Sequence, residues 1–295
     1  GNGRPARVTS SNHTRPRTVD EAHKAQDRDE PDESKLRERL RRIRHGVLVL
    51  SGKGGVGKST VAVNLAVVLA EQGHRVGLLD ADIHGPSVAT LLGIEASSVV
   101  SDGDNLMPVP WGPNLAVMSI ALLLGGQDEA VIWRGPMKMG ALRQFLTDVA
   151  WGDLDFLIID LPPGTGDEPL SVCQLVPEAA GGLVVTTPQD VSVSDVRRCV
   201  TFCRSLDLPV LGILENMSGF ACPHCGEVTD VFGSGGGRRL AEDMGVPFLG
   251  SVPIDPRVVE ASDCGKPFAA ELPDSPATGS FRRAIAPISE LSAED

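Results

Sequence analysis

The sequence predicts an α/β fold: a doubly wound, mostly parallel sheet with helices on both faces. Short apolar segments alternate with helical segments over about 230 residues, which is the pattern of repeated strand–helix–strand units. The apolar segments are nearly continuous, as expected for strands that are buried on both faces of a parallel sheet. The chain has 295 residues, of which 41% are hydrophobic, and this is enough for one large core.

The first part of the chain, residues 1–45, is predicted to be a disordered basic arm that contains one short helix. Residues 1–32 are polar, with scattered Pro and Gly, and they carry too little apolar surface to offset the entropy of ordering. The apolar spacing within residues 33–44 indicates a short basic helix. The ordered domain is expected over residues 46–275.

Six strands and four helices are predicted within this domain. The strands are Val47–Leu50, Arg75–Leu79, Asn114–Ile120, Phe156–Ile159, Leu183–Thr187 and Val210–Leu214. The helices are Lys58–Gln72, Met137–Val149, Ser194–Ser205 and Gly237–Met244. Gly73 directly follows the first helix, at a position that favours glycine. The tail, residues 276–295, is expected to be weakly structured because Pro, Ser and Ala are frequent near the end of the chain.

Charge is unevenly distributed along the chain, whose net charge is −12. Residues 1–45 hold 12 Lys and Arg against 8 Asp and Glu, and the other 250 residues hold 15 against 31. An acidic body disfavours non-specific binding of nucleic acid. No apolar run reaches the ~18 residues of a membrane span, and residues 1–20 lack the apolar core of a signal peptide. We therefore expect a cytoplasmic protein without a membrane partner, in which the six cysteines are free thiols or metal ligands.

A glycine-rich loop lies between the first predicted strand and the first predicted helix. Its sequence, GKGGVGKS, fits the phosphate-binding pattern G-x-x-x-x-G-K-[ST] in the structural context that supports the motif. Glycines let backbone N–H groups turn toward phosphate oxygens, and the helix N-terminus adds a favourable dipole. Lys58 is predicted to neutralise phosphate charge during catalysis, and Ser59 to ligate Mg²⁺. The residues expected to bind ATP here are Gly52, Lys53, Gly54, Gly55, Val56, Gly57, Lys58, Ser59 and Thr60.

Lys53 distinguishes this loop from an ordinary phosphate loop, which has no lysine directly after its first glycine. The loop resembles the deviant Walker A motif, GKGGxGK[ST], of a group of dimeric ATPases. In that group the extra lysine reaches the nucleotide of the facing subunit, so the resemblance implies a catalytic role for Lys53. Its ammonium group would stabilise charge in the transition state, as an arginine finger does. A solvated surface lysine is the alternative.

Two carboxylates follow the second predicted strand. Asp80 and Asp82 are separated by one residue at the carboxyl end of a parallel strand, where ligands bind in open α/β sheets. Asp80 is predicted to hold a water of Mg²⁺, and Asp82 to orient the water that attacks the phosphate. Both residues could instead be turn formers.

Further nucleotide contacts are expected after two later strands. Asp160 ends the apolar run FLIID, which has the Walker B form, so we expect it in the outer shell of the metal. The Pro-Pro-Gly turn after this strand places the Gly164 N–H to sense the γ-phosphate. Asn216 follows another strand and could pair with the donor–acceptor edge of adenine, or act as a turn former.

Cys222 and Cys225 form a C-x-x-C pair that provides half of the ligands for a metal site. Zinc and a [4Fe–4S] cluster both use four ligands and both accept thiolates. Two chains with two cysteines each would complete the set in a symmetric dimer. His224 could replace one ligand, and a redox dithiol of thioredoxin type is a further alternative. The other four cysteines are predicted to be buried core thiols: Cys173, Cys199, Cys203 and Cys264.

Together these motifs resemble the Mrp/ApbC family of iron–sulfur cluster carrier ATPases, over Gly46 to about Phe268. The matching segments are Ser51–Thr60, Asp80–Ser87, Trp133–Pro136, Asp155–Asp167, Glu215–Ser218, Cys222–Gly226 and Val252–Asp255. The resemblance implies a homodimer that binds ATP and Mg²⁺ and holds a labile [4Fe–4S] cluster between the paired C-x-x-C motifs. It also implies a cluster donor and apo-protein acceptors as partners. Residues 1–45 contain no cysteine, so the second cluster site of some relatives is not expected.

Two other functions stay open at this stage. The first is a positioning ATPase of the MinD/ParA type, which needs an amphipathic C-terminal membrane helix or a basic DNA-binding face. The acidic body and the acidic end of the tail disfavour it. The second is an ATP-sensing regulator with a structural zinc knuckle at Cys222 and Cys225, because thiolates suit both metals.

Overall fold

The computed structural model describes residues 33–103, 105–123, 135–221 and 227–293. A helical segment over residues 33–40 comes first. The strands are β1 Ile43–Ser51, β2 Val76–Asp80, β3 Val100–Asp102, β4 Asn105–Met107, β5 Val109–Trp111, β6 Leu115–Ser119, β7 Leu154–Asp160, β8 Gly181–Thr186, β9 Val210–Glu215, β10 Phe220–Ala221, β11 Val228–Thr229 and β12 Phe248–Ser251. The helices are α2 Lys58–Glu71, α3 Val88–Leu91, α4 Gly135–Thr147, α5 Asp167–Leu175, α6 Asp190–Ser205, α7 Gly236–Met244, α8 Pro256–Asp263, α9 Phe268–Glu271 and α10 Pro276–Ser289, with short 3₁₀ turns Ile120–Leu122 and Glu290–Ala293.

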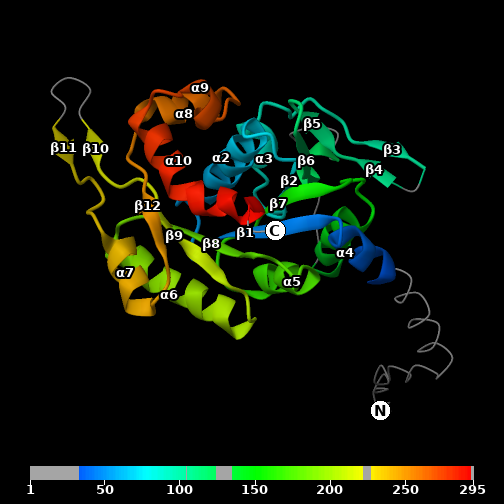
Figure 1. The fold of residues 1–295 in the computed structure, drawn as a ribbon, viewed down its shortest axis with the longest axis horizontal. Coiled ribbons are helices and arrows are strands. Elements are labelled where there is room, and N and C mark those ends of the chain that lie inside the picture. The colour runs from blue at the N-terminus through cyan, green and yellow to red at the C-terminus, as the bar shows by residue number, and fades with distance from the viewer. Residues whose placement is uncertain (1–32, 104, 124–134, 222–226, 294–295) are drawn as a thin grey trace, which may run out of the picture.

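An eight-stranded sheet in the order β12-β9-β8-β1-β7-β2-β6-β5 forms the centre of the molecule (Figure 1). All neighbouring strands are parallel except β5, which pairs antiparallel with β6. The register aligns Asp80 of β2 with Asp160 of β7. Because the parallel strands share one direction, their carboxyl ends form a single edge, and both aspartates lie on it.

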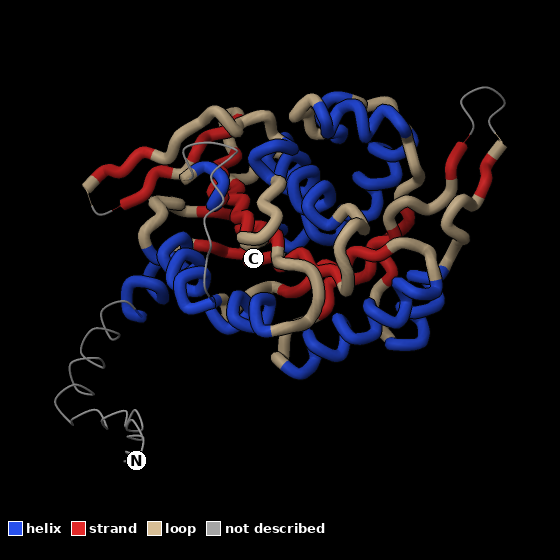
Figure 2. The backbone as a smooth tube through the Cα atoms, turned by 180° about the vertical axis from the view of Figure 1, so that it is seen from behind, coloured by secondary structure: helices blue, strands red, loops and turns tan. Residues whose placement is uncertain are grey.

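Helices cover both faces of this sheet, as the views from the two sides show (Figures 1 and 2). Strand β1 illustrates the division: Val47 and Val49 pack in the core under α2 and α10, and Leu48 and Leu50 pack in the core under α4 and α5. Helices α6 and α7 cover the same face as α4 and α5, toward the β9 and β12 edge. The strands are buried on both faces, which confirms the predicted doubly wound α/β class.

All six predicted strands and all four predicted helices are present, with ends shifted by up to four residues. The basic helix predicted over residues 33–44 ends at residue 40, because Ile43 already pairs with Leu154 in β1. The ordered region therefore begins before the predicted boundary at Gly46. The arm predicted for residues 1–32 lies outside the described residues.

The C-terminal tail differs from its prediction. Residues 276–289 form α10 rather than a weakly structured segment. Ser275 caps this helix by accepting a hydrogen bond from the Ala277 N–H, and Pro276 occupies the first turn, where its missing N–H costs nothing. The small and apolar residues recur at helical spacing on one face and are buried: Ala277, Phe281, Ala284, Ile285 and Ile288. Composition was therefore misleading, because the periodicity and not the Pro and Ser content decides the structure here.

Replacing Phe281 by alanine is expected to destabilise the protein by about 3–5 kcal/mol, because the removed ring leaves a cavity in the core. The side chain is fully buried, and its ring meets that of Phe268 edge to face at 5.4 Å between centroids. Urea unfolding measures the effect. The exposed Arg283 on the same helix provides the control, since Arg283→Ala should shift stability by less than about 0.5 kcal/mol. Equal midpoints for Phe281→Ala and the parent would contradict the packing of α10.

Candidate functional site

Polar residues end the central strands at the carboxyl edge of the sheet. Ser51 ends β1, Asp80 ends β2, Ser119 ends β6, Asp160 ends β7 and Glu215 ends β9. All five are at most 1% exposed, although polar residues are rarely so buried. The loops that follow β1, β2 and β7 carry the predicted nucleotide-binding residues, so the topology brings these loops together.

The glycines of the phosphate loop are required by its geometry. Gly55 and Gly57 have φ values of +79° and +83°, in the left-handed region that favours glycine. A Cβ at Gly52 would collide with Asp195 of α6, and one at Gly57 would collide with the amide of Asn216. At Gly54 a Cβ would meet nothing within 4 Å among the described residues, so this side of the loop is open. The result is a backbone cradle at the N-terminus of α2, which suits phosphate groups.

Lys58 and Asp160 form a buried ion pair beneath this loop. Lys58 Nζ lies 2.5 Å from Asp160 Oδ1, and the two side chains are 7% and 0% exposed. Burial raises the pKa of Asp160, against the attraction of Lys58. The second oxygen, Asp160 Oδ2, is buried and has no hydrogen-bond partner in the described part of the chain. A buried carboxylate oxygen with free acceptor capacity, near the Ser59 hydroxyl, suits a hydrated Mg²⁺.

Asp80 is held by protein groups on both oxygens. Its Oδ2 accepts hydrogen bonds from Ser119 Oγ at 3.0 Å and the Val88 N–H at 3.2 Å, and its Oδ1 accepts from the Asp82 N–H at 3.2 Å. Burial, with the charge of Asp160 as a second cause, raises the pKa of Asp80 to about 7. Ser119 was not predicted from the sequence, although a serine at the end of an apolar strand was a usable signal.

Asp82 and Gly164 each have a structural contact besides their predicted roles. Asp82 Oδ1 accepts from the Gly85 N–H at 3.2 Å, as a turn-forming aspartate does. The Gly164 N–H donates to the Ser51 carbonyl at 2.8 Å, and its φ is +95°. A γ-phosphate would compete with Ser51 for that donor. The predicted roles of both residues in catalysis stay predictions.

Asn216 lies against the phosphate loop itself. Its Nδ2 donates to the Val56 carbonyl at 3.0 Å, which uses one of its two amide hydrogens. The other amide hydrogen is compatible with the contact with adenine that was predicted for Asn216. The loop contact spans 160 positions of sequence, and no local pattern indicated it.

The predicted cluster ligands, Cys222 and Cys225, lie outside the described residues. The flanking segments are described: β10 and β11 pair antiparallel and project from the β12 side of the sheet (Figure 1). Of the remaining cysteines, Cys173, Cys199 and Cys203 are buried, as predicted. Cys264 is exposed and corrects the prediction, because it lies just after α8, where the chain turns toward α9.

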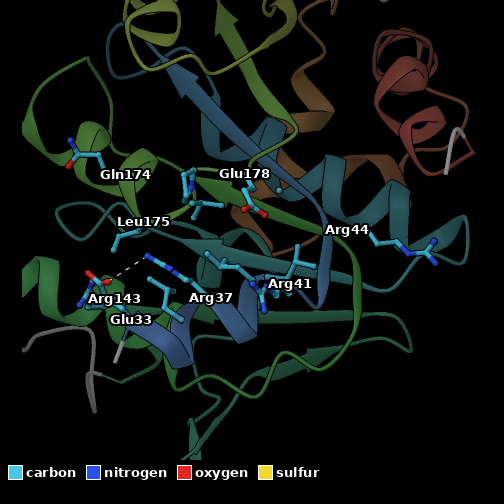
Figure 3. A pocket seen from close by; sticks show the side chains of 14 residues that line it. Glu33, Arg37, Arg41, Arg44, Arg143, Gln174, Leu175 and Glu178 are labelled. Carbon is cyan, nitrogen blue, oxygen red and sulfur yellow. Dashed lines mark ion pairs between the residues drawn. The ribbon is translucent and has the colours of Figure 1, made fainter. Parts of the chain in front are cut away.

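A cavity of about 640 Å³ lies away from this edge of the sheet. It lies where β1 begins, between the helical segment 33–40 and the end of α5, and Arg37, Arg41 and Arg143 line it (Figure 3). Glu33 lies 3.8 Å from Arg37 and 4.0 Å from Arg143, so part of the basic charge is balanced within the cavity. This cavity therefore differs from the predicted nucleotide site, which is an open cradle.

Comparison with known proteins decides the family. The family described as ParA: NUBPL iron-transfer P-loop NTPase matches residues 42–289. The chain belongs to this family. An iron-sulfur cluster carrier protein of Methanocaldococcus jannaschii is 48% identical over 258 residues, which cover 88% of each chain. A cytosolic Fe-S cluster assembly factor NUBP2 homolog of Culex quinquefasciatus is 55% identical over 239 residues, 80% of this chain and 93% of the relative.

Solved structures agree with this NUBPL-type assignment. A nucleotide-binding protein of Archaeoglobus fulgidus, in complex with ADP, has a TM-score of 0.71 and 43% identity, over 80% of this chain and 92% of its own. The cell division protein MinD of Aquifex aeolicus has a TM-score of 0.60 at 20% identity, over 85% and 98%, and shares the fold. Within the described ranges, no helix has both the length and the apolar character that crossing a membrane requires.

Proposed function

We propose that this chain is an ATP-hydrolysing carrier, which holds a labile [4Fe–4S] cluster as cargo and passes it to apo-proteins. The observation that supports ATP binding and hydrolysis is the buried Lys58–Asp160 ion pair beneath an open, glycine-rich phosphate loop. The relatives named as iron–sulfur cluster carrier or assembly factors support the cargo. The C-x-x-C pair at Cys222 and Cys225 supplies the thiolates that such a cargo needs.

Residues of this chain would bind and orient the nucleotide. Backbone N–H groups of residues 52–59 would hold the phosphates, and Lys58 would move its ammonium group from Asp160 toward them. Asp160 and Ser59 would hold Mg²⁺, directly or through water, and the ion would neutralise phosphate charge. Asp80 already accepts hydrogen bonds from Ser119 and Val88, so it would contact Mg²⁺ through a water molecule. Asp82 would orient the attacking water.

A homodimer follows from the number of ligands. A [4Fe–4S] cluster uses four thiolates, each chain offers Cys222 and Cys225, and two-fold symmetry doubles them. A cluster held between subunits is released when the interface opens, which suits a carrier. Its partners would be a cluster donor and apo iron–sulfur proteins, in the cytoplasm.

The alternative functions receive less support. A positioning ATPase needs an amphipathic C-terminal membrane helix or a basic DNA-binding face. In α10 the apolar residues Phe281, Ile285 and Ile288 are buried in the core. The acidic charge of residues 46–295 disfavours a DNA-binding face. The zinc-knuckle regulator uses the same two cysteines and differs in its metal. Anaerobic reconstitution with iron and sulfide separates them: a carrier develops the broad visible absorption of an iron–sulfur cluster, and a zinc knuckle keeps one zinc per dimer.

Replacing Lys53 by alanine is expected to slow hydrolysis roughly tenfold or more and to leave ATP binding nearly unchanged, because its ammonium group acts on the transition state. The expected action across the dimer gives a sharper result. In a dimer of one Lys53→Ala chain and one Asp82→Ala chain, the first chain keeps its own Asp82 and receives Lys53 from its partner. Mixing the two impaired variants should therefore raise the rate of hydrolysis above that of either variant alone. If mixing restores nothing, Lys53 does not act in trans.

A further inference from the structure

The basic segment at residues 33–44 carries two sets of side chains with different contacts. One set attaches the segment to the rest of the domain. Lys35 Nζ lies 2.6 Å from Asp148 Oδ1, just after α4. Arg42 Nε donates to Asp153 Oδ1 at 2.9 Å, just before β7. These two cations hold the segment in place, so their charges are already used within the chain.

The second set faces the cavity of about 640 Å³ at the start of β1 (Figure 3). Arg37 and Arg41 lie one helical turn apart on the segment, and Arg143 of α4 approaches from a second element. Arg44 also lines the cavity, but its side chain points away from Arg37 and Arg41 (Figure 3). Arg41 is exposed and has no ion pair within the described part of the chain. Its charge is therefore available to a ligand.

The charge of this cavity is opposite to that of the protein as a whole. Its lining holds four arginines against two glutamates, Glu33 and Glu178, so it has a net charge of +2 in a chain whose net charge is −12. Arginine binds carboxylates and phosphates through paired N–H donors. The lining therefore favours an anionic ligand.

The floor between the arginines is apolar and recessed. Leu36 and Val176 are 7% and 6% exposed, and Leu40 and Leu175 are half-buried beside them. Leu36 and Leu40 each directly precede one of the two arginines of the segment. An occupant that fits both parts needs acidic and aliphatic groups at close spacing, which a peptide provides. A flat layer of lipid headgroups would reach the arginines and leave the recessed floor empty.

The position of the cavity separates it from the nucleotide site. Ile43 and Gly46, near the start of β1, line the cavity, whereas the phosphate loop follows Ser51 at the other end of the strand. The nine residues of β1 span about 30 Å. A partner bound at the cavity therefore leaves the phosphate loop accessible.

We propose that this cavity is a docking site for an acidic segment of a partner protein. Carboxylates of the segment pair with Arg37 and Arg41, and a neighbouring aliphatic side chain enters the floor over Leu36. The site goes beyond the proposed function, because it uses no residue of the nucleotide site and neither cysteine of the C-x-x-C pair. Its electrostatic part makes binding sensitive to salt.

A synthetic peptide tests the site on the full chain. The probe is a fluorescein-labelled peptide of four Glu-Glu-Leu repeats, and its binding is followed by fluorescence anisotropy. We expect a Kd on the order of 10 μM in about 50 mM salt, weakened at least roughly fivefold in about 300 mM salt. Repeats of Gln-Gln-Leu or of Glu-Glu-Ser should each bind at least about fivefold more weakly, because each lacks one of the two required groups.

Two adjacent arginines provide a matched pair of variants. Arg41 lines the cavity, whereas Arg42 is paired with Asp153 and does not line it. Both substitutions by alanine remove one positive charge at nearly the same place in the chain. Arg41→Ala should weaken peptide binding about tenfold, and Arg42→Ala should stay within about twofold of the parent. Both variants should hydrolyse ATP at the parental rate.

Two results with the peptide would overturn the docking site: no saturable binding up to about 1 mM peptide, or an equal loss of affinity in Arg41→Ala and Arg42→Ala. Two further results would assign the cavity to another occupant and so contradict the proposal. One is Arg41-dependent binding to vesicles of phosphatidylcholine and phosphatidylserine without binding to the peptide. The other concerns the acidic residues that directly precede the segment.

These residues are neutralised together in the variant Asp27→Asn/Asp29→Asn/Glu30→Gln/Asp32→Asn. If the chain's own residues 27–32 fill the cavity, this variant should bind the peptide more than about fivefold more tightly than the parent, and the gain should vanish when Arg41→Ala is added. A partner's acidic segment as the occupant requires a smaller change than this.

Discussion

Lys58→Ala is expected to abolish ATP hydrolysis and to weaken ATP binding by at least tenfold. On the proposed function the lysine would supply the charge-assisted contact to the phosphates, and a loss of about 2–5 kcal/mol corresponds to tenfold or far more in rate. The variant also leaves the carboxylate of Asp160 buried without its cation, since Asp160 is 0% exposed. We therefore expect the free energy of unfolding to fall by about 3–5 kcal/mol, so that the variant unfolds at a lower denaturant concentration. Titration with a fluorescent ATP analogue and a phosphate-release assay measure the two functional effects.

A matched control separates the phosphate contact from a general loss of charge. Lys266 is exposed and pairs with Glu271 at 2.9 Å, far along the chain from the phosphate loop. Lys266→Ala should hydrolyse ATP as the parent does, and its stability should change by less than about 1 kcal/mol. Circular dichroism at the assay temperature shows whether Lys58→Ala remains folded. Hydrolysis at the parental rate by folded Lys58→Ala contradicts the assignment of the phosphate loop.

The double replacement Cys222→Ser/Cys225→Ser is expected to remove bound iron and sulfide while ATP binding stays within about twofold of the parent. Oxygen is a poor ligand for iron in such clusters, and four thiolates are needed per dimer. Iron and acid-labile sulfide are measured after anaerobic reconstitution. About four of each per dimer are expected in the parent and none in the double variant.

The other four cysteines provide the control for this replacement. Cys264→Ser changes an exposed residue and should leave both stability and cluster content unchanged. Cys199→Ala removes a buried thiol, so it should cost stability but no iron. Loss of iron from Cys264→Ser would show that the cluster has other ligands than Cys222 and Cys225.

The sequence predicted those parts of the fold that short segments determine. The six buried strands appear as continuous apolar runs, and the phosphate loop is a contiguous motif with its own strand and helix. The helix α10 was missed because its Pro and Ser residues resemble a loop by composition, while Phe281 and its neighbours pack at helical spacing. Strand β12 was missed because it is short and half-buried and contains Gly250.

Contacts between distant segments could not be predicted. The Lys58–Asp160 pair spans 102 positions, and it forms because β7 lies directly beside β1 in the sheet. The Asn216–Val56 contact depends on β8 lying beside β1 and on β9 lying beside β8. Strand order depends on the whole chain. Local patterns can therefore indicate candidate residues, but the topology determines which of them come into contact.

Transfer of the cluster tests the carrier function most directly. Reconstituted protein is mixed anaerobically with an apo-enzyme whose activity requires a [4Fe–4S] cluster, in the presence of a chelator that captures free iron. Acceptor activity is expected to appear as the visible absorption of the carrier is lost, and protein with Cys222→Ser/Cys225→Ser is expected to transfer nothing. An acceptor that stays inactive, together with one tightly held zinc per dimer in protein isolated under iron-replete, anaerobic conditions, would contradict the carrier and support the zinc knuckle.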